Sequence, residues 1–393
     1  MFADRTNWSL APNRLSTALD ARRRSGQPLL DLTASNPTIC GFQYDREAIL
    51  RSLADPGALT YSPDPRGLAP ARQAIAGYYA EVGAAVPADS LFLAASTSEA
   101  YSWTFRALCN PGEAVLVPAP SYPLLGFLAE LADVRLLRYP LIYDHGWQMD
   151  FHALEQALTP AARAVVVVHP NNPTGQYTSA ADSQRLAELC AARGMAVIAD
   201  EVFFDFALAE APHPPPPSFA GAGAALTFTL SGLSKICGLP QMKASWLAVS
   251  GPERLKAAAS ARLEVIADTY LSPSAPVQLA LPALLALRAG FQRQVRERLA
   301  RNLAELDRQL PAQRSCSRLK VEGGWYAVMR VPATRSDEDL AVELLIRHGV
   351  YLHPGHFYDF PSEGYVVVSL LTPEHEFAEG IRALLEWLRS GHF

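Results

Sequence analysis

Short apolar runs alternate with longer helical patterns through residues 91–250, and this alternation constrains the fold more than any other feature. The predicted strands are residues 91–95, 114–118, 164–169, 195–199, 226–230 and 245–250. Several are almost continuously apolar, as at 164–168, which suits a strand covered on both faces. Helical patterns lie between them, at 98–109 and 180–193. The alternation predicts an α/β domain with a mostly parallel sheet.

The alternation of short apolar runs with helical patterns ends at about residue 275. Residues 277–310 are rich in Ala, Leu and Arg and predict one long helix. Short strands are predicted at 324–331 and 365–370, followed by a closing helix at 373–388. These elements predict a second, smaller α+β domain.

Charge and composition exclude several classes of partner. The net charge is −5 and the pI about 6.0, with no long basic run, so neither nucleic acid nor an anionic membrane is an expected partner. No run of 18 apolar residues is present. The five scattered cysteines suit reduced thiols in a cytoplasm. His353 and His356 have no third clustered ligand, so we expect no metal site.

Polar residues follow most of the predicted strands at the point where each ends. These segments are 96–98 (Ser-Thr-Ser), 121–122 (Ser-Tyr), 171–175 (Asn-Asn-Pro-Thr-Gly), 200–201 (Asp-Glu) and 231–235 (Ser-Gly-Leu-Ser-Lys). Each alone has an ordinary explanation, such as a helix cap, a turn or a surface lysine. Because ligands bind beyond the carboxyl ends of parallel strands, we expect the segments to converge on one site.

Together these groups match the chemistry of pyridoxal phosphate. A helix that begins near Thr97 suits a phosphate. Asp200 suits the pyridine nitrogen, the amide of Asn172 the ring oxygen, and the amine of Lys235 the aldehyde.

The chain resembles the class I/II aminotransferases, which are fold type I pyridoxal-phosphate enzymes. The resemblance runs from about residue 29 to the C-terminus and rests on eight segments: 61–67 (YSPDPRG), 98–100 (SEA), 111–118 (PGEAVLVP), 120–123 (PSYP), 172–175 (NPTG), 200–203 (DEVF), 234–240 (SKICGLP) and 353–355 (HPG). It implies a large domain, residues 46–274, with a mostly parallel seven-stranded sheet. Residues 1–45 and 275–393 would together form the small domain.

The resemblance also implies a role for each matching residue. Lys235 would form the Schiff base and move the proton between substrate and cofactor, in an exchange of an amino group between an amino donor and an oxo acid. Asp200 would keep the pyridine nitrogen protonated, Asn172 would bind the ring oxygen, and Tyr122 would stack on the ring. Ser35 is a candidate substrate contact.

A further set of residues would surround the phosphate: Thr97, Ser98, Ser234 and Lys243. Tyr61 would reach the phosphate of the neighbouring subunit, which implies a homodimer.

Three cofactor positions depart from the family pattern. Phe203 replaces a tyrosine that donates to the ring oxygen, so we expect a raised pKa of the Schiff base. Lys243 replaces an arginine, which keeps the charge but loses the bidentate fork. Gly232 replaces a serine, so a phosphate hydroxyl is expected to be missing.

The fourth departure concerns the substrate. Val367 stands where the family has the arginine that binds the substrate carboxylate, and His356 is a candidate replacement. This change leaves open another pyridoxal-phosphate reaction on the same scaffold, such as that of a lyase, decarboxylase or cyclase. A non-catalytic sensor is a further alternative, but the chain offers no helix-turn-helix and no basic face.

Overall fold

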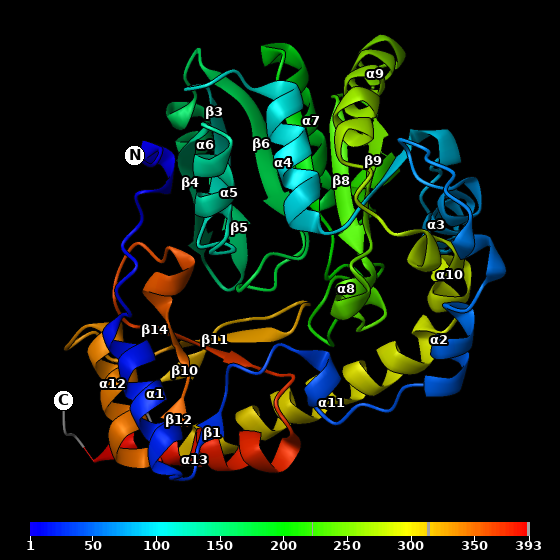
Figure 1. The fold of residues 1–393 in the computed structure, drawn as a ribbon. Helices are drawn as coiled ribbons and strands as arrows, with labels where there is room; N and C mark the ends of the chain where they lie inside the picture. The colour runs from blue at the N-terminus through cyan, green and yellow to red at the C-terminus, as the bar shows by residue number, and fades with distance from the viewer. Residues whose placement is uncertain (222, 313–314, 391–393) are drawn as a thin grey trace.

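The computed structural model describes residues 1–221, 223–312 and 315–390. An eight-stranded sheet lies at the centre of the larger part, in the order β2–β9–β8–β7–β6–β3–β4–β5 (Figure 1). Its strands are β2 (Leu91–Ala94), β3 (Ala114–Ala119), β4 (Arg135–Tyr143), β5 (Trp147–Met149), β6 (Ala162–Val168), β7 (Ala196–Asp200), β8 (Thr227–Gly232) and β9 (Ser245–Ser250).

The strands from β8 through β7, β6 and β3 to β4 are mutually parallel, whereas β9 is antiparallel to both β8 and β2. The predicted α/β fold with a mostly parallel sheet is therefore confirmed. The short strand β5 forms a hairpin with β4 and adds an eighth strand at the edge. The runs at 91–250 did not reveal these two strands, because β4 is partly exposed and its apolar residues are interrupted by Arg135, Arg138 and Pro140.

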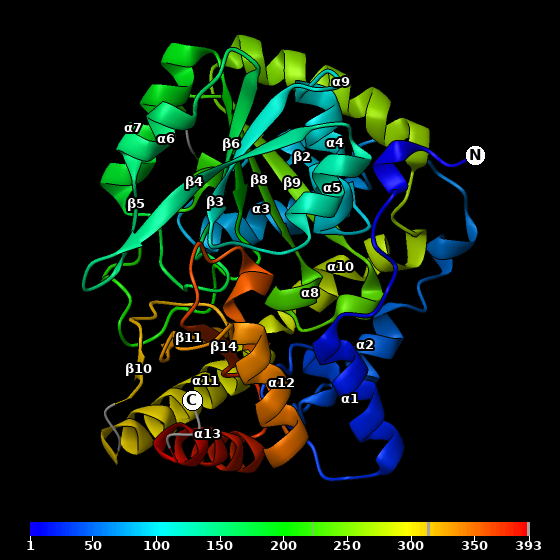
Figure 2. The same ribbon diagram turned by 90° about the vertical axis from the view of Figure 1, so that its left-hand side faces the viewer.

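Helices cover both faces of this sheet. One layer contains α4 (Thr97–Leu108), α5 (Leu125–Leu131) and α9 (Glu253–Tyr270), and the other contains α6 (Phe151–Ala157) and α7 (Ala180–Arg193) (Figure 2). Alternate residues of β6 serve the two layers: Val166 packs towards α4, and Val165 towards α7. Burial on both faces explains why the central strands are continuously apolar.

The N-terminal and C-terminal segments lie together in the smaller part (Figure 1). Its four-stranded antiparallel sheet contains β10 (Ser317–Arg318), β11 (Tyr326–Arg330), β14 (Tyr365–Ser369) and β13 (His353–Pro354). Helices α1 (Arg14–Ser25), α12 (Asp337–His348) and α13 (Glu374–Arg389) lie beside it (Figure 1). The short strands β1 (Leu30–Asp31) and β12 (Val350–Tyr351) pair in parallel and join the two ends of the chain.

The prediction of a single helix at 277–310 is wrong. The segment forms α10 (Ala275–Ala286) and α11 (Arg288–Gln309), separated at Leu287. Leucines of α10 share a core with Trp246 of the large sheet, whereas those of α11 pack in the small part, so the chain must turn between them. The division at residue 274 remains a prediction.

The remaining helices are short except for α3. They are α2 (Arg46–Ser52), α3 (Ala69–Glu81), α8 (Leu233–Ile236) and the 3-10 segments η1 (Asp4–Thr6), η2 (Pro37–Ile39), η3 (Pro56–Leu59), η4 (Ala88–Ser90), η5 (Phe219–Gly221), η6 (Pro240–Met242), η7 (Leu310–Ala312) and η8 (Gly355–Tyr358). Within the described ranges, no helix combines the length and the apolar character needed to cross a bilayer.

Candidate active site

A cavity lies at the ends of β6, β7 and β8, beside α8 and β11 of the small sheet. Its empty volume, open solvent included, is about 710 Å³. The lining residues are Ser35, Thr97, Tyr122, Val168, Asn172, Asp200, Val202, Phe203, Ser234, Lys235 and Tyr326. The structure thus brings together eight of the site residues predicted from the sequence.

Lys235 is a buried amine in this cavity. Its Nζ lies 4.9 Å from the ring centroid of Trp325 and 5.7 Å from that of Phe203. Burial lowers the pKa of Lys235 to about 8, against a smaller opposing effect of Asp200. An amine with such a pKa is partly neutral near physiological pH, as a nucleophile or proton carrier requires.

Asp200 ends β7 and is also buried. Burial raises the pKa of its carboxyl to about 6, although three partners oppose the rise. The backbone N–H of Val202 donates to Oδ1 at 3.1 Å, and the hydroxyl of Tyr101 donates to Oδ2 at 3.1 Å. Lys235 contributes a weaker attraction. The site therefore offers an ionised carboxylate at neutral pH, held in position by a tyrosine.

Asn172 leaves a hydrogen-bonding group unused in the cavity. Its Oδ1 is buried and has no partner among the described residues. A buried polar atom without a partner is costly, and a bound ligand can relieve that cost. Tyr122, on the loop after β3, lines the same cavity and can present its ring to such a ligand.

The N-terminus of α4 supplies the anion-binding feature. Ser96 caps this helix by accepting from the backbone N–H of Glu99, while the Glu99 carboxylate accepts from the backbone N–H of Ala95. Thr97, the first helical residue, lines the cavity, so the positive end of the helix dipole lies there.

Four predicted residues do not line the cavity of this chain. Ser98 is the next residue of α4 and is half-buried. Lys243 is exposed after η6 with a left-handed φ of 52°. Tyr61 is 82% exposed. His356 in η8 is exposed, with its ring against Phe357.

The structure explains the glycine at position 232. Gly232 pairs with Ser245 in the adjacent strand. A Cβ on Gly232 would lie 2.3 Å from the Ser245 Oγ and 2.9 Å from its Cα, so no side chain fits. The hydroxyl of Ser245 occupies the space that a serine at 232 would need.

Val367 belongs to the apolar core of the small domain. It is 1% exposed and pairs with Val328 on one side and His353 on the other. Its cluster contains Leu319, Val328, Tyr358 and Phe360. The position at which the family places a carboxylate-binding arginine is therefore filled by packing.

Two polar residues of the site were missed from the sequence. Tyr101 stands one helical turn after Thr97, and that spacing could have revealed it. Tyr326, in β11, carried no such signal, because it comes from a strand remote in sequence from the other lining residues.

Comparison with known proteins gives a consistent result. The model of the family "Aminotransferase class I and II" matches residues 28–384. The chain is 29% identical over 380 residues to an alanine aminotransferase of Mycobacterium tuberculosis, covering 93% of this chain and 86% of that protein. It is 28% identical over 351 residues to the glutamate-pyruvate aminotransferase AlaA of Escherichia coli, covering 86% of this chain and 84% of that protein.

Solved structures show the same fold. An aminotransferase from Escherichia coli superposes with a TM-score of 0.86 at 23% identity, covering 100% of this chain and 99% of that one. An alanine aminotransferase from Pyrococcus furiosus gives a TM-score of 0.87 at 21% identity, covering 99% of this chain and 100% of that one.

Proposed function

Because the chain belongs to the class I and II aminotransferases and is a pyridoxal-phosphate-dependent aminotransferase, we propose that Lys235 binds the cofactor covalently. The observation that carries this proposal is a buried amine that shares a cavity with a buried carboxylate. Bound pyridoxal phosphate supplies an aldehyde that condenses with amines and a ring that accepts electrons from the carbon bearing the amino group.

The other lining residues would bind and orient the cofactor. Asp200, ionised above about pH 6, would keep the pyridine nitrogen protonated. The side-chain N–H of Asn172 would donate to the ring oxygen, Tyr122 would cover the ring, and Phe203 would border it without a hydrogen bond. A set of residues at the N-terminus of α4 and beyond β8 would bind the phosphate: Thr97, Ser98, Ser234 and Lys243.

Lys235 would then carry the proton in both halves of the amino exchange between a donor and an oxo acid. A pKa of about 8 lets its amine accept and return a proton near neutral pH. The apolar rings of Phe203 and Trp325 beside it exclude water from the transfer.

Borohydride reduction followed by peptide mapping tests the assignment. The chain has four lysines, namely Lys235, Lys243, Lys256 and Lys320. Reduction of the holoenzyme should attach the cofactor to the peptide that contains Lys235. Attachment to any of the other three lysines would overturn the proposal.

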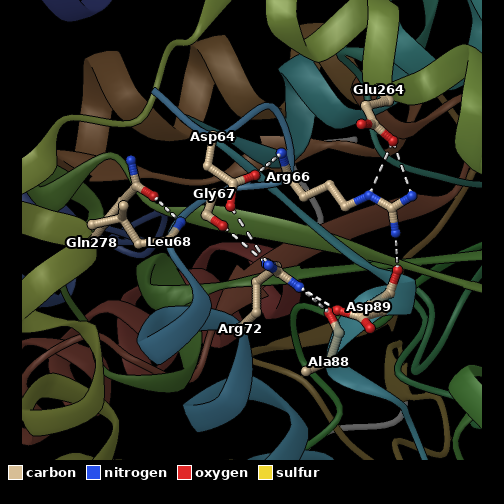
Figure 3. A network of polar contacts seen from close by, with 9 residues as sticks. All are labelled: Asp64, Arg66, Gly67, Leu68, Arg72, Ala88, Asp89, Glu264 and Gln278. Carbon is tan, nitrogen blue, oxygen red and sulfur yellow. Dashed lines mark hydrogen bonds and ion pairs between the residues drawn. The ribbon is translucent and has the colours of Figure 1, made fainter. Parts of the chain in front are cut away.

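We also propose a homodimer in which Tyr61 completes the site of the partner. The loop that carries Tyr61 is held by hydrogen bonds and ion pairs of two arginines (Figure 3). Arg72 donates to the Gly67 carbonyl and to Asp89, each at 2.9 Å, while Arg66 donates to Glu264 at 2.9 Å. Tyr61 on this loop is exposed and does not line the cavity of its own chain, which supports the proposal.

Mixed dimers test this arrangement. The homodimer of Lys235→Ala and the homodimer of Tyr61→Ala should each be defective in activity. If Tyr61 acts across the interface, their heterodimer contains one site with both residues intact, and activity should return towards half that of the wild type. If the heterodimer is shown to form and its activity does not recover at all, the role of Tyr61 in the partner's site is contradicted.

The cytoplasm is our proposed location, because Cys40, Cys109, Cys190 and Cys237 form no disulfide among the described residues.

A further inference from the structure

Two aromatic rings face the amine of Lys235. Its Nζ lies over the ring of Trp325, 4.9 Å from the centroid, and over the ring of Phe203, 5.7 Å from the centroid. Both distances fall within the range of about 6 Å at which the negative face of an aromatic ring attracts a cation, and tryptophan attracts a cation most strongly. The two rings therefore act on the charge of the amine as well as on its contact with water.

Packing fixes the Trp325 ring in this position. The ring lies edge-to-face against Phe203 and Phe206, with 5.2 Å between the centroids in each pair. Trp325 is fully buried, and its carbonyl accepts a hydrogen bond from the backbone N–H of Leu370 at 2.8 Å. Its indole nitrogen has no hydrogen-bond partner among the described residues, so packing orients the ring.

Phe203 adds a second ring face from another direction. Its plane is inclined at 64° to that of Trp325, and the Lys235 amine lies over both rings. Phe203 is also buried and lines the cavity. The amine is thus bordered by two aromatic faces that are not parallel to each other.

Few other groups stabilise a charge on this amine. Among the described residues that line the cavity, Asp200 is its acidic partner. Tyr122 and Tyr326 line the same cavity, and burial raises the pKa of each to about 12, so both hydroxyls are neutral at pH 7. Burial itself opposes the charge of Lys235. One carboxylate and two ring faces therefore surround the protonated amine.

We propose that the ring faces of Trp325 and Phe203 stabilise the protonated form of Lys235 during proton transfer, so that both are positioning residues of the reaction. The proposal rests on the aminotransferase function above and adds two residues to its proton carrier. When Nζ takes the proton, a C–H bond of the substrate breaks, its electron pair is taken up by the bound cofactor, and an N–H bond forms. The amine thereby becomes an ammonium group in a buried site, where an isolated charge is unfavourable. Aromatic faces reduce that penalty and still exclude water.

Fluorinated tryptophan at position 325 tests the proposal. Fluorine withdraws charge from the face of a ring while nearly preserving its size, so the attraction for a cation weakens but burial stays the same. Tryptophan with one, two or three ring fluorines is placed at this position alone. The pKa of Lys235 is then measured by NMR in the cofactor-free, full-length protein with ¹³C-labelled lysine. The chain has only four lysines, so each signal can be assigned by a single Lys→Arg substitution.

We expect the pKa of Lys235 to fall with each added fluorine, by about 0.5 unit or more in total. The other three lysines are internal controls, whose titration should not respond to fluorine. The matched control is the same series at Trp103, which is 1% exposed and packs in the core between α4 and the large sheet. Fluorine at Trp103 should leave the Lys235 titration unchanged. A pKa of Lys235 that does not depend on the fluorine content at position 325 would overturn the proposal.

Fluorinated phenylalanine at position 203 provides a second, independent series. Its effect on the pKa should have the same sign but be smaller, because Phe203 lies farther from Nζ and a phenyl ring attracts a cation less strongly. If the proteins fluorinated at position 325 do not fold, this series decides. A rise of the pKa, or no change, would count against the proposal.

Rate measurements connect the titration to the reaction. The holoenzymes of the tryptophan series are mixed with L-alanine or L-glutamate, and conversion of the bound cofactor is followed by absorbance. The rate should fall about threefold to tenfold from tryptophan to the trifluorinated residue. A lower pKa with an unchanged rate would overturn the role in proton transfer. If wild type converts its cofactor with neither amino acid, the proposed function is contradicted, whereas the lysine titration still decides whether the rings stabilise the ammonium group.

Discussion

Replacing Lys235 with methionine removes a buried cation while keeping a similar side-chain volume. The ordinary pKa of lysine is 10.5, and burial lowers that of Lys235 to about 8. A difference of about 2.5 units corresponds to about 3 kcal/mol at 1.36 kcal/mol per unit. This is the cost of keeping the amine charged in the folded protein below pH 8. Methionine avoids this cost but also removes the attraction between Lys235 and Asp200.

We therefore expect the free energy of unfolding of cofactor-free Lys235→Met at pH 7 to be about 1–3 kcal/mol higher than that of the cofactor-free wild type. Between about pH 8 and 10.5 the folded wild type binds fewer protons than the unfolded chain, so its stability rises with pH. The advantage of the variant should shrink over this interval. The catalytic amine thus lowers the stability of the apoenzyme.

Urea denaturation of the cofactor-free proteins at pH 7, 8, 9 and 10, at one protein concentration, measures the effect. Lys256→Met is the matched control, because Lys256 lies on the surface and pairs with Glu253 at 2.7 Å. Its loss should change the free energy of unfolding by no more than about 0.5–1 kcal/mol. A Lys235→Met protein no more stable than wild type at pH 7, or with a difference independent of pH, would refute the reasoning.

Three further substitutions test the surroundings of the cofactor. Tyr101→Phe removes a hydrogen bond to Asp200, so the pKa of Asp200 should rise above about 6 and cofactor affinity at pH 7 should fall about tenfold. The loss should diminish towards pH 8.5, and a loss equal at every pH would contradict this explanation. Phe203→Tyr adds a donor, so the midpoint of the absorbance pH titration of the bound cofactor should fall by about one unit; an unchanged midpoint would show that no such bond forms. Gly232→Ser should destabilise the fold by about 1–3 kcal/mol in urea denaturation, because its Cβ overlaps Ser245, and the added change Ser245→Gly should restore part of that loss.

The sequence alone predicted the mostly parallel sheet and eight of the residues that line the cavity. Continuous apolar runs such as 164–168 predicted strands buried on both faces, and the structure confirms β6 and its neighbours. Asp200 is the last residue of β7, and Asn172 and Lys235 come shortly after the ends of β6 and β8. Because parallel strands end at one edge of a sheet, a local pattern was enough to predict that these side chains meet.

Tertiary structure decided the features that depend on contacts between distant segments. The break at Leu287 follows from two helices that pack in different cores, although the pattern of 277–310 reads as one helix. Gly232 is required by Ser245 of the adjacent strand.

The small-domain side of the cavity likewise came only from the fold. Tyr326 and Ser35 are nearly three hundred residues apart and line the same cavity, and Val367 is buried by the register of β11 and β14. Local sequence specifies which backbone hydrogen bonds a segment can form and which face it buries. Which side chains then oppose one another across a cavity depends on how the two domains pack.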